Sequence, residues 1–150
     1  MQNLFLDLAK LNSQEKTIAG LEVLSKLLQN IVNFPNEKKY RCILKSNKAV
    51  SSKLLSLKGV LPLLKQIGYT DLGPEKLELY PEAFGSLPGV LSDCNSALSE
   101  LKVDFEEAEK QRHQKHLQDI KNKFKAQEAE KKRILQQAHL DREEFVHKHL

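Results

Sequence analysis

The stretch that decides the fold starts with KYRCILKSNKAV at residues 39–50, continues with LLSLKGVLPLL at residues 54–64 and ends with QIGY at residues 66–69. Segments with the apolar spacing of short helices alternate in it with short runs of mixed polarity. This order predicts a domain that mixes helices and strands.

Each piece of this stretch carries a local signal. Residues 40–46 are short and mixed in polarity and predict a strand. Asn47 is a suitable N-cap for a helix that runs through Leu55, because its side-chain oxygen can accept hydrogen bonds from backbone N–H groups. Residues 58–67 predict a second short helix, and Gly68 stands where a residue with positive φ ends a helix.

A longer helix is predicted before this stretch. Its apolar residues recur three and four positions apart: Ile18, Leu21, Leu24, Leu27, Leu28, Ile31 and Val32. Asn12-Ser13 can cap this helix, with Glu15 placed for a capping-box contact, and Phe34-Pro35 ends it. Residues 4–11 predict an earlier helix that packs alongside.

The segments that follow predict a small sheet and a further helix. Residues 69–70 and 77–80 alternate in polarity like two strands joined by a turn at residues 72–74. Residues 87–101 carry another apolar stripe at helical spacing. Helices combined with a small antiparallel sheet make this an α+β domain.

The composition changes near residue 101. All six Gly and all five Pro precede this point, and all five His follow it. The remainder is rich in Glu, Lys, Gln, Arg and Ala and predicts a long charged helix. We therefore expect a helical extension at residues 1–14, a domain at residues 15–101 and a helical tail at residues 102–150.

The tail carries a weak apolar stripe, formed by Leu117, Ile120, Phe124, Leu135, Ala138 and Phe145. At heptad spacing the intervening positions are Gln127, Lys131 and Asp141, which make a poor coiled-coil seam. Pairs at i,i+4, such as Glu106–Lys110, support a solvated single helix. A long exposed helix and a weak coiled coil both remain open.

The ordered set of motifs resembles a known family. The string from Lys39 to Val50, the Lys58-Gly-Val-Leu turn into a helix, the Ile67-Gly-Tyr exit and a return strand ending at Pro81 follow one another. This set resembles the PUB (also called PUG) domain of cytoplasmic peptide:N-glycanase and of the linear-ubiquitin ligase HOIP, over residues 15–101.

The resemblance implies a non-catalytic docking domain. PUB domains bind the acidic C-terminal tail of the AAA ATPase valosin-containing protein (Cdc48), which presents a Leu-Tyr pair. Some also bind Tyr-containing acidic motifs inside other proteins. The resemblance therefore implies an adaptor in ubiquitin-dependent protein quality control, including endoplasmic-reticulum-associated degradation by the proteasome.

The resemblance also implies a peptide pocket between the long helix and the Tyr40-to-Asn47 segment. The helix asparagine of the family falls on Asn30, the aromatic residue on Tyr40 and the central asparagine on Asn47. An asparagine side chain offers two donors and an acceptor, so Asn47 can hold an extended peptide backbone in register.

Four further positions complete the expected pocket, and two of them depart from the family. Leu44 occupies the place of a basic strand residue, although Lys45 is adjacent and Lys48 adds charge nearby. Leu27 replaces a helix tyrosine, which bears on the affinity and on the contact to the ligand tyrosine. The lysines would attract an acidic tail and speed the encounter.

Structural roles remain open for each of these residues. Asn47 can act as a helix cap alone, Tyr40 as a half-buried strand aromatic, and Asn30 as a solvated helix residue. The lysines can form an ordinary solvated face.

Other functions find little support in the sequence. Cys42 and Cys94 are far apart, suit neither a disulfide scaffold nor a paired metal site, and have no His near them. His113 and His116 lack a third ligand in register. We expect no catalytic activity, no cofactor and no metal.

Membrane and nucleic-acid roles are also unexpected. No apolar run approaches the ~20 residues of a membrane span, and the N-terminus does not resemble a signal peptide. A net charge of +4 permits nucleic-acid binding, but basic and acidic residues alternate in the tail without interleaved aromatics. We expect a cytoplasmic or nuclear adaptor; the alternative is a coiled-coil self-association protein whose N-terminal domain is a cap.

Overall fold

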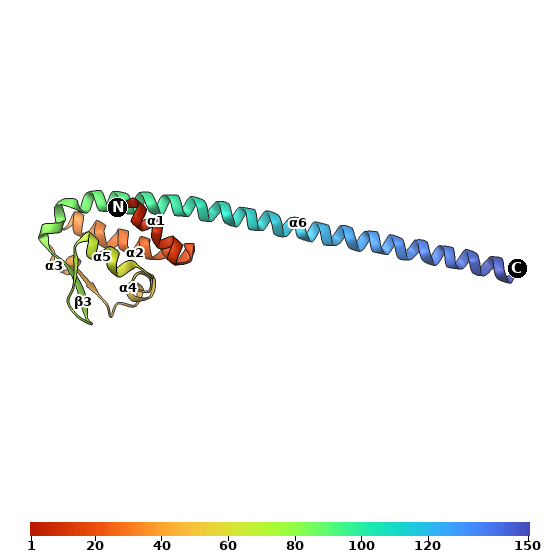
Figure 1. The fold of residues 1–150 in the computed structure, drawn as a ribbon, viewed down its shortest axis with the longest axis horizontal. Helices are drawn as coiled ribbons and strands as arrows, with labels where there is room; N and C mark the ends of the chain where they lie inside the picture. The colour runs from red at the N-terminus through yellow and green to blue at the C-terminus, as the bar shows by residue number, and fades with distance from the viewer. The chain divides into compact units, whose positions relative to one another are not determined.

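The computed structural model describes residues 1–150, which form two units, Met1–Glu106 and Glu107–Leu150. The first unit contains a three-stranded sheet and the helices packed around it, while the last helix runs on into the second unit (Figure 1). The elements in chain order are α1 (Gln2–Leu11), α2 (Gln14–Asn33), α3 (Lys38–Arg41), β1 (Cys42–Leu44), α4 (Lys48–Val50), η1 (Ser51–Leu55), α5 (Val60–Ile67), β2 (Tyr69–Asp71), β3 (Lys76–Leu79), η2 (Pro81–Ser86) and α6 (Leu87–His149).

The sheet is antiparallel with strand order β1-β3-β2. Ile43 of β1 lies opposite Leu77 of β3, and Tyr69 of β2 lies opposite Leu79 of β3. These four side chains are buried, so they form the face of the sheet that packs on the core. The α+β prediction is confirmed.

Helix α2 matches its predicted bounds and its predicted cap at Ser13, but not the predicted capping-box contact of Glu15. Ser13 is the N-cap and its hydroxyl accepts from the Lys16 backbone N–H, so Glu15 stands one position too early for the reciprocal contact of a capping box. Asn12 instead ties the end of α1 to the loop before α5. Its amide donates to the Leu8 and Lys58 carbonyls, and its oxygen accepts from the Lys58 N–H.

The predicted strand at residues 40–46 is shorter than expected. Tyr40 and Arg41 belong to the helical turn α3, and only Cys42–Leu44 are extended. Arg41 supports this turn, because its guanidinium donates to the Pro35 carbonyl at 2.7 and 3.2 Å and lies 4.9 Å from the centre of the Phe84 ring. These contacts come from distant residues, which local polarity does not reveal.

The segment after Asn47 confirms the predicted helices. Asn47 caps α4, which continues as the π-helix η1 to Leu55. Helix α5 ends at Gly68 with a φ of 124°, and Gly59 precedes it with a φ of 85°. Side chains other than glycine are strained in these left-handed conformations, so both glycines serve the backbone.

The core lies between α2, the sheet, α5 and the first turns of α6. Leu21, Leu24 and Leu28 of α2 are fully buried, as is Cys94 of α6. The stripe predicted at residues 87–101 is confirmed as the buried face of α6 in the first unit, with Ala97 as an additional buried member. Phe5 of α1 is also fully buried, so α1 completes this core.

The second unit is a single helix. Every residue from 111 to 150 is exposed, and α6 is helical as far as His149. The predicted helical tail is therefore confirmed. None of the helices combines the length and apolarity that a membrane crossing requires.

Candidate peptide-binding face

One flank of α2 lies beside the segment that the sequence singles out. Leu27, Asn30 and Phe34 are spaced three and four residues apart, so they share this flank. Helix α2 packs against α3, which contains Tyr40, and against α4, which Asn47 caps. We define a candidate surface by Leu27, Asn30, Phe34, Tyr40, Leu44, Asn47 and Lys48, and call it the peptide-binding face after the role that the resemblance implies.

An aromatic pair forms one end of this face. The rings of Phe34 and Tyr40 lie 5.7 Å apart, and Lys39 Nζ lies 4.9 Å from the centre of the Tyr40 ring. Phe34 is 52% exposed, whereas Tyr40 packs partly against the core. Sequence reasoning treated Phe34 only as a helix end. Its place four residues after Asn30 is the signal that would have assigned it to this face.

Asn47 forms the other end, and only half of its hydrogen-bonding capacity is used. Its Oδ1 accepts from the Ala49 and Val50 N–H groups at 3.0 and 3.4 Å. Its Nδ2 group has no partner within the protein, and the residue is exposed. The Asn47 backbone N–H donates to the Leu44 carbonyl, and the Leu44 side chain is 53% exposed. One backbone turn therefore joins an exposed apolar residue to a residue that has two free side-chain N–H donors.

Lys45 is the predicted site residue whose charge is already paired. Its Nζ donates to Asp71 Oδ1 at 2.8 Å and to the Gly73 carbonyl at 2.7 Å. The hydrogen bond from Lys45, together with its positive charge, holds the pKa of the Asp71 carboxyl below its ordinary value. These contacts attach the end of β1 to the β2–β3 turn. Lys48 has no such partner and is exposed.

Residues 14–88, half of the chain, match the PUB domain family. The chain belongs to the PUB domain family. PUB domains are protein–protein interaction modules, so the match supports a non-catalytic docking role. The matched residues contain every member of the peptide-binding face and every strand of the sheet. Helix α1 and the long continuation of α6 lie outside the match.

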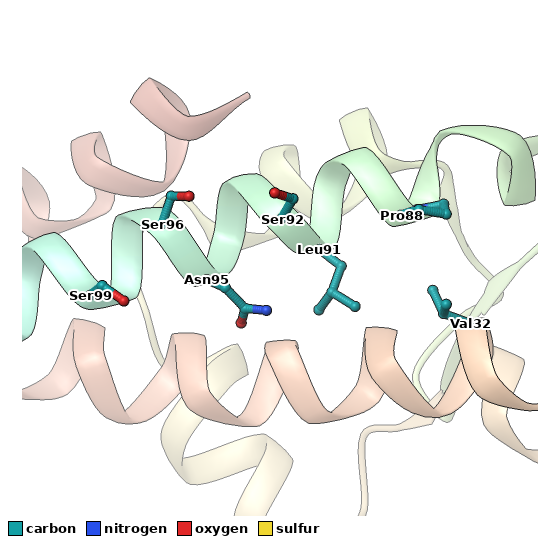
Figure 2. A pocket seen from close by; sticks show the side chains of 7 residues that line it. All are labelled: Val32, Pro88, Leu91, Ser92, Asn95, Ser96 and Ser99. Carbon is teal, nitrogen blue, oxygen red and sulfur yellow. The ribbon is translucent and has the colours of Figure 1, made fainter.

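The opposite flank of α2 borders a shallow groove of about 440 Å³ (Figure 2). Leu91 and Asn95 point from α6 toward α2, and Val32 points from α2 into the same space (Figure 2). The Ser25 hydroxyl donates to Asn95 Oδ1 at 2.6 Å and joins the two helices. The residues that line this groove carry no charge.

Two titratable side chains of the PUB domain, Cys94 and Tyr69, are buried in its core. Burial raises the pKa of the Cys94 thiol to about 12, and its Sγ lies 3.8 Å from the Leu21 carbonyl oxygen. The Tyr69 hydroxyl is buried without a hydrogen-bond partner, and burial raises its pKa. Both cysteines are free. Nowhere do three His, Cys, Asp or Glu side chains gather closely enough to hold a metal ion.

Proposed function

We propose that this PUB domain docks onto the acidic C-terminal tail of the Cdc48/valosin-containing AAA ATPase, through the Leu-Tyr pair of that tail. The chain would then act as an adaptor in ubiquitin-dependent protein quality control in the cytoplasm or nucleus. Membership of the family supports the docking role, and the peptide-binding face supports the choice of ligand.

The observation that carries the proposal is that the side-chain oxygen of Asn47 is hydrogen-bonded within the domain while its side-chain N–H groups are free. The side-chain oxygen is committed to capping α4, and this commitment fixes the direction of the amide. The Nδ2 donors remain for the carbonyl groups of an extended peptide. Asn30 on the adjacent flank of α2 offers a second amide to the same peptide.

Apolar contacts would come from the side chains around these amides. Leu27, Leu44 and the exposed Phe34 supply surface for the ligand leucine and tyrosine. Leu27 and Leu44 stand where family members carry a tyrosine and a basic residue, so this face is more apolar and less basic than the family pattern. We expect ~µM affinity, because a short peptide buries a small area.

The acidic character of the peptide would be recognised mainly by exposed lysines. Lys38, Lys39 and Lys48 flank the face and are exposed, although Lys39 lies 4.0 Å from the exposed carboxylate of Glu37. Lys45 is more closely paired, with Asp71 at 2.8 Å. Such exposed charges raise the association rate more than they deepen the affinity. Replacing Lys48 with Gln should therefore slow binding and weaken its salt dependence.

The test is a titration of the full chain with a fluorescent peptide that carries the acidic Leu-Tyr C-terminus. Asn47→Ser keeps a capping hydroxyl but removes the amide donors, so it should retain the stability of the domain and weaken binding at least about tenfold. Asn47→Ala should lose both the cap and the binding. A tyrosine-phosphorylated peptide should bind less tightly, because an apolar slot would have to desolvate the added charge.

Two results would contradict the proposal. The first is an absence of saturable binding at high micromolar peptide. The second is binding by Asn47→Ser that equals binding by the unmodified chain, since the Asn47 amide would then make no contact with the peptide.

A further inference from the structure

The second unit carries an apolar stripe with a period of 11 residues. Phe124, Leu135 and Val146 follow one another at this interval and are 65%, 70% and 45% exposed. Eleven residues make three turns of an α-helix almost without drift, so these side chains lie along one line. Ile120 and Leu117 extend the same stripe about one and two turns before Phe124. A helix that presents this stripe alone leaves it in water.

Charged residues interrupt the stripe at positions that repeat with the same period. Ile120 is followed after 11 and 22 residues by Lys131 and Arg142, and Leu117 is followed after 11 by Glu128. If the apolar residues are instead assigned to a seven-residue repeat, Lys131 and Asp141 both fall at core positions, and the repeat gives no pairing between them. The 11-residue frame places Glu128 and Lys131 on the stripe as neighbours, three positions apart.

The stripe positions are symmetric about the middle of the tail. If two tails run in opposite directions and cross at the point between residues 129 and 130, Phe124 of one copy lies opposite Leu135 of the other. Glu128 of one copy then lies opposite Lys131 of the other. The same arrangement places Ile120 opposite His139, Leu117 opposite Arg142, and His113 opposite Val146, all of which belong to the stripe. A second copy that runs in the opposite direction would therefore meet this stripe in register.

Charge selects this direction over the parallel one. In a parallel, in-register pair every stripe residue faces its own copy, so Glu128, Lys131 and Arg142 would each meet a like charge. In the antiparallel pair Glu128 meets Lys131, and this contact occurs twice about the two-fold axis. Arg142 can lay its aliphatic stem along Leu117 while its charge stays in water.

The flanking charges favour the same direction. Residues 110–125 contain six Lys or Arg side chains against the single acid Asp119. Residues 134–150 contain the three acids Asp141, Glu143 and Glu144 against the two bases Arg142 and Lys148. Antiparallel pairing places the basic half of one helix beside the more acidic half of the other, whereas parallel pairing places the two basic halves together.

We propose that the tail of this chain forms an antiparallel homodimer through the stripe defined by Leu117, Ile120, Phe124, Glu128, Lys131 and Leu135. The dimer joins two PUB domains in one particle, so a partner that presents several docking tails is held by more than one of them. This proposal does not depend on the ligand of the PUB domain, and its test uses no peptide.

A basic amphipathic helix can also bind an anionic membrane surface. Membrane binding would explain the basic residues 110–125. It would not explain Leu135 and Val146, because the acidic residues near them would be repelled by an anionic membrane. The second copy accounts for both halves of the stripe.

The first test is sedimentation equilibrium of the full chain from about 1 to about 100 µM. The unmodified chain should show a reversible monomer–dimer equilibrium. Phe124→Glu should weaken the dimer at least about 100-fold, since each dimer loses two buried rings. Leu140→Glu is the matched control, because Leu140 is 58% exposed but lies about 160° around the helix from Phe124.

Three results would overturn the proposal. They are a monomer throughout this range, an equal effect of Leu140→Glu and Phe124→Glu, and a monomeric chain whose binding to phosphatidylserine vesicles is lost in Phe124→Glu. Glutamate is a strong helix former, so circular dichroism should show unchanged helicity in both variants.

The second test reads the direction of pairing by disulfide trapping in a Cys42→Ser background, where the remaining Cys94 is buried. A mixture of Ile120→Cys and His139→Cys chains should form mixed dimers under mild oxidation. Ile120→Cys alone should not cross-link, because its two copies lie roughly 28 Å apart along an antiparallel pair. Cross-linking of Ile120→Cys to itself would establish a parallel pair and overturn the proposal.

Discussion

Helix α2 and the tail of α6 are both regular helices, yet different forces hold them. Leu21, Leu24 and Leu28 of α2 share one helix face and are fully buried, while the charged residues between them, Glu22 and Lys26, lie on other faces of the helix. The tail interrupts its stripe with charges, and its residues are exposed from position 111 onward. Packing stabilises α2, whereas helix propensity and i,i+3 or i,i+4 pairs such as Arg112–Glu109 stabilise the tail.

This difference teaches that the continuity of an apolar stripe decides whether a helix joins a core. A side chain such as Phe5 in the first unit contributes to the unfolding free energy of the domain, but the same side chain in the tail contributes only through a second chain. Substitutions matched between the two units test this statement. Tyr40, Tyr69 and Tyr80 all lie in the first unit, so tyrosine circular dichroism reports its unfolding alone.

The largest contrast is expected between two phenylalanines. Phe5→Ala removes a fully buried ring and should destabilise the domain by about 3–5 kcal/mol in denaturant unfolding. Phe124→Ala removes a ring that is 65% exposed and should leave the tyrosine transition unchanged within about 0.5 kcal/mol. Because Phe5 lies outside residues 14–88, a mild effect of Phe5→Ala would show that the family-matched segment holds its core without α1.

Two glycines provide the next contrast. A Cβ on Gly20 would lie 2.6 Å from the Lys53 carbonyl oxygen and would also collide with the Leu57 side chain. Gly20→Ala should therefore destabilise the domain by about 1–3 kcal/mol, because the π-helix η1 must move away from α2. Gly89→Ala, in α6 with open space around its Cβ, should stabilise by about 0.5–1 kcal/mol. Equal effects would mean that α2 and η1 are not in close contact in solution.

The sequence predicted most helices because their signals are local. The apolar spacing, the Asn47 cap and Gly68 lie within or next to the elements that they define. It failed at Tyr40 and Arg41, where a carbonyl and a ring from other segments hold a helical turn, and at Asn12, whose partners include Lys58. Long-range contacts of this kind leave no periodic trace in a sequence.

The peptide-binding face was only partly accessible to the same reasoning. The resemblance supplied Asn30, Tyr40 and Asn47, and the structure adds the exposed Phe34 beside Tyr40. The sequence placed Lys45 among the free charges, because its partner Asp71 belongs to another strand. That these side chains hold the peptide is a prediction, and the peptide titration tests it.

Stability at alkaline pH should distinguish the buried thiol of Cys94 from the half-buried thiol of Cys42. The Cys94 pKa of about 12 lies above the ordinary thiol value near 8.5, so the folded domain retains a proton that the unfolded chain loses. The contribution of the Cys94 thiol to the unfolding free energy is therefore fully present below pH ~8.5. Between pH ~9 and ~10 it should lower the unfolding free energy by about 1 kcal/mol per pH unit. Cys94→Ala should remove most of this slope in tyrosine-detected unfolding, although the buried Tyr69 hydroxyl, whose pKa is also raised, adds a slope of the same sign as the pH approaches ~10. Cys42→Ala should retain the full slope.

The smallest effect is expected at the opposite end of the pH scale, from the paired carboxylate of the sheet. The pKa of Asp71 is lowered in the folded domain by the hydrogen bond and charge of Lys45, so this pair stabilises the fold above the unfolded pKa of ~3.9. That stabilisation is lost as the pH falls through the lowered pKa. Asp71→Asn should therefore flatten the acid side of the stability curve slightly. Glu130→Gln, which breaks the exposed pair with Arg133 on the tail, should leave the tyrosine transition unchanged at every pH. A response to Glu130→Gln as large as the response to Asp71→Asn would mean that the tail stabilises the domain, and the contrast between the two units would fail.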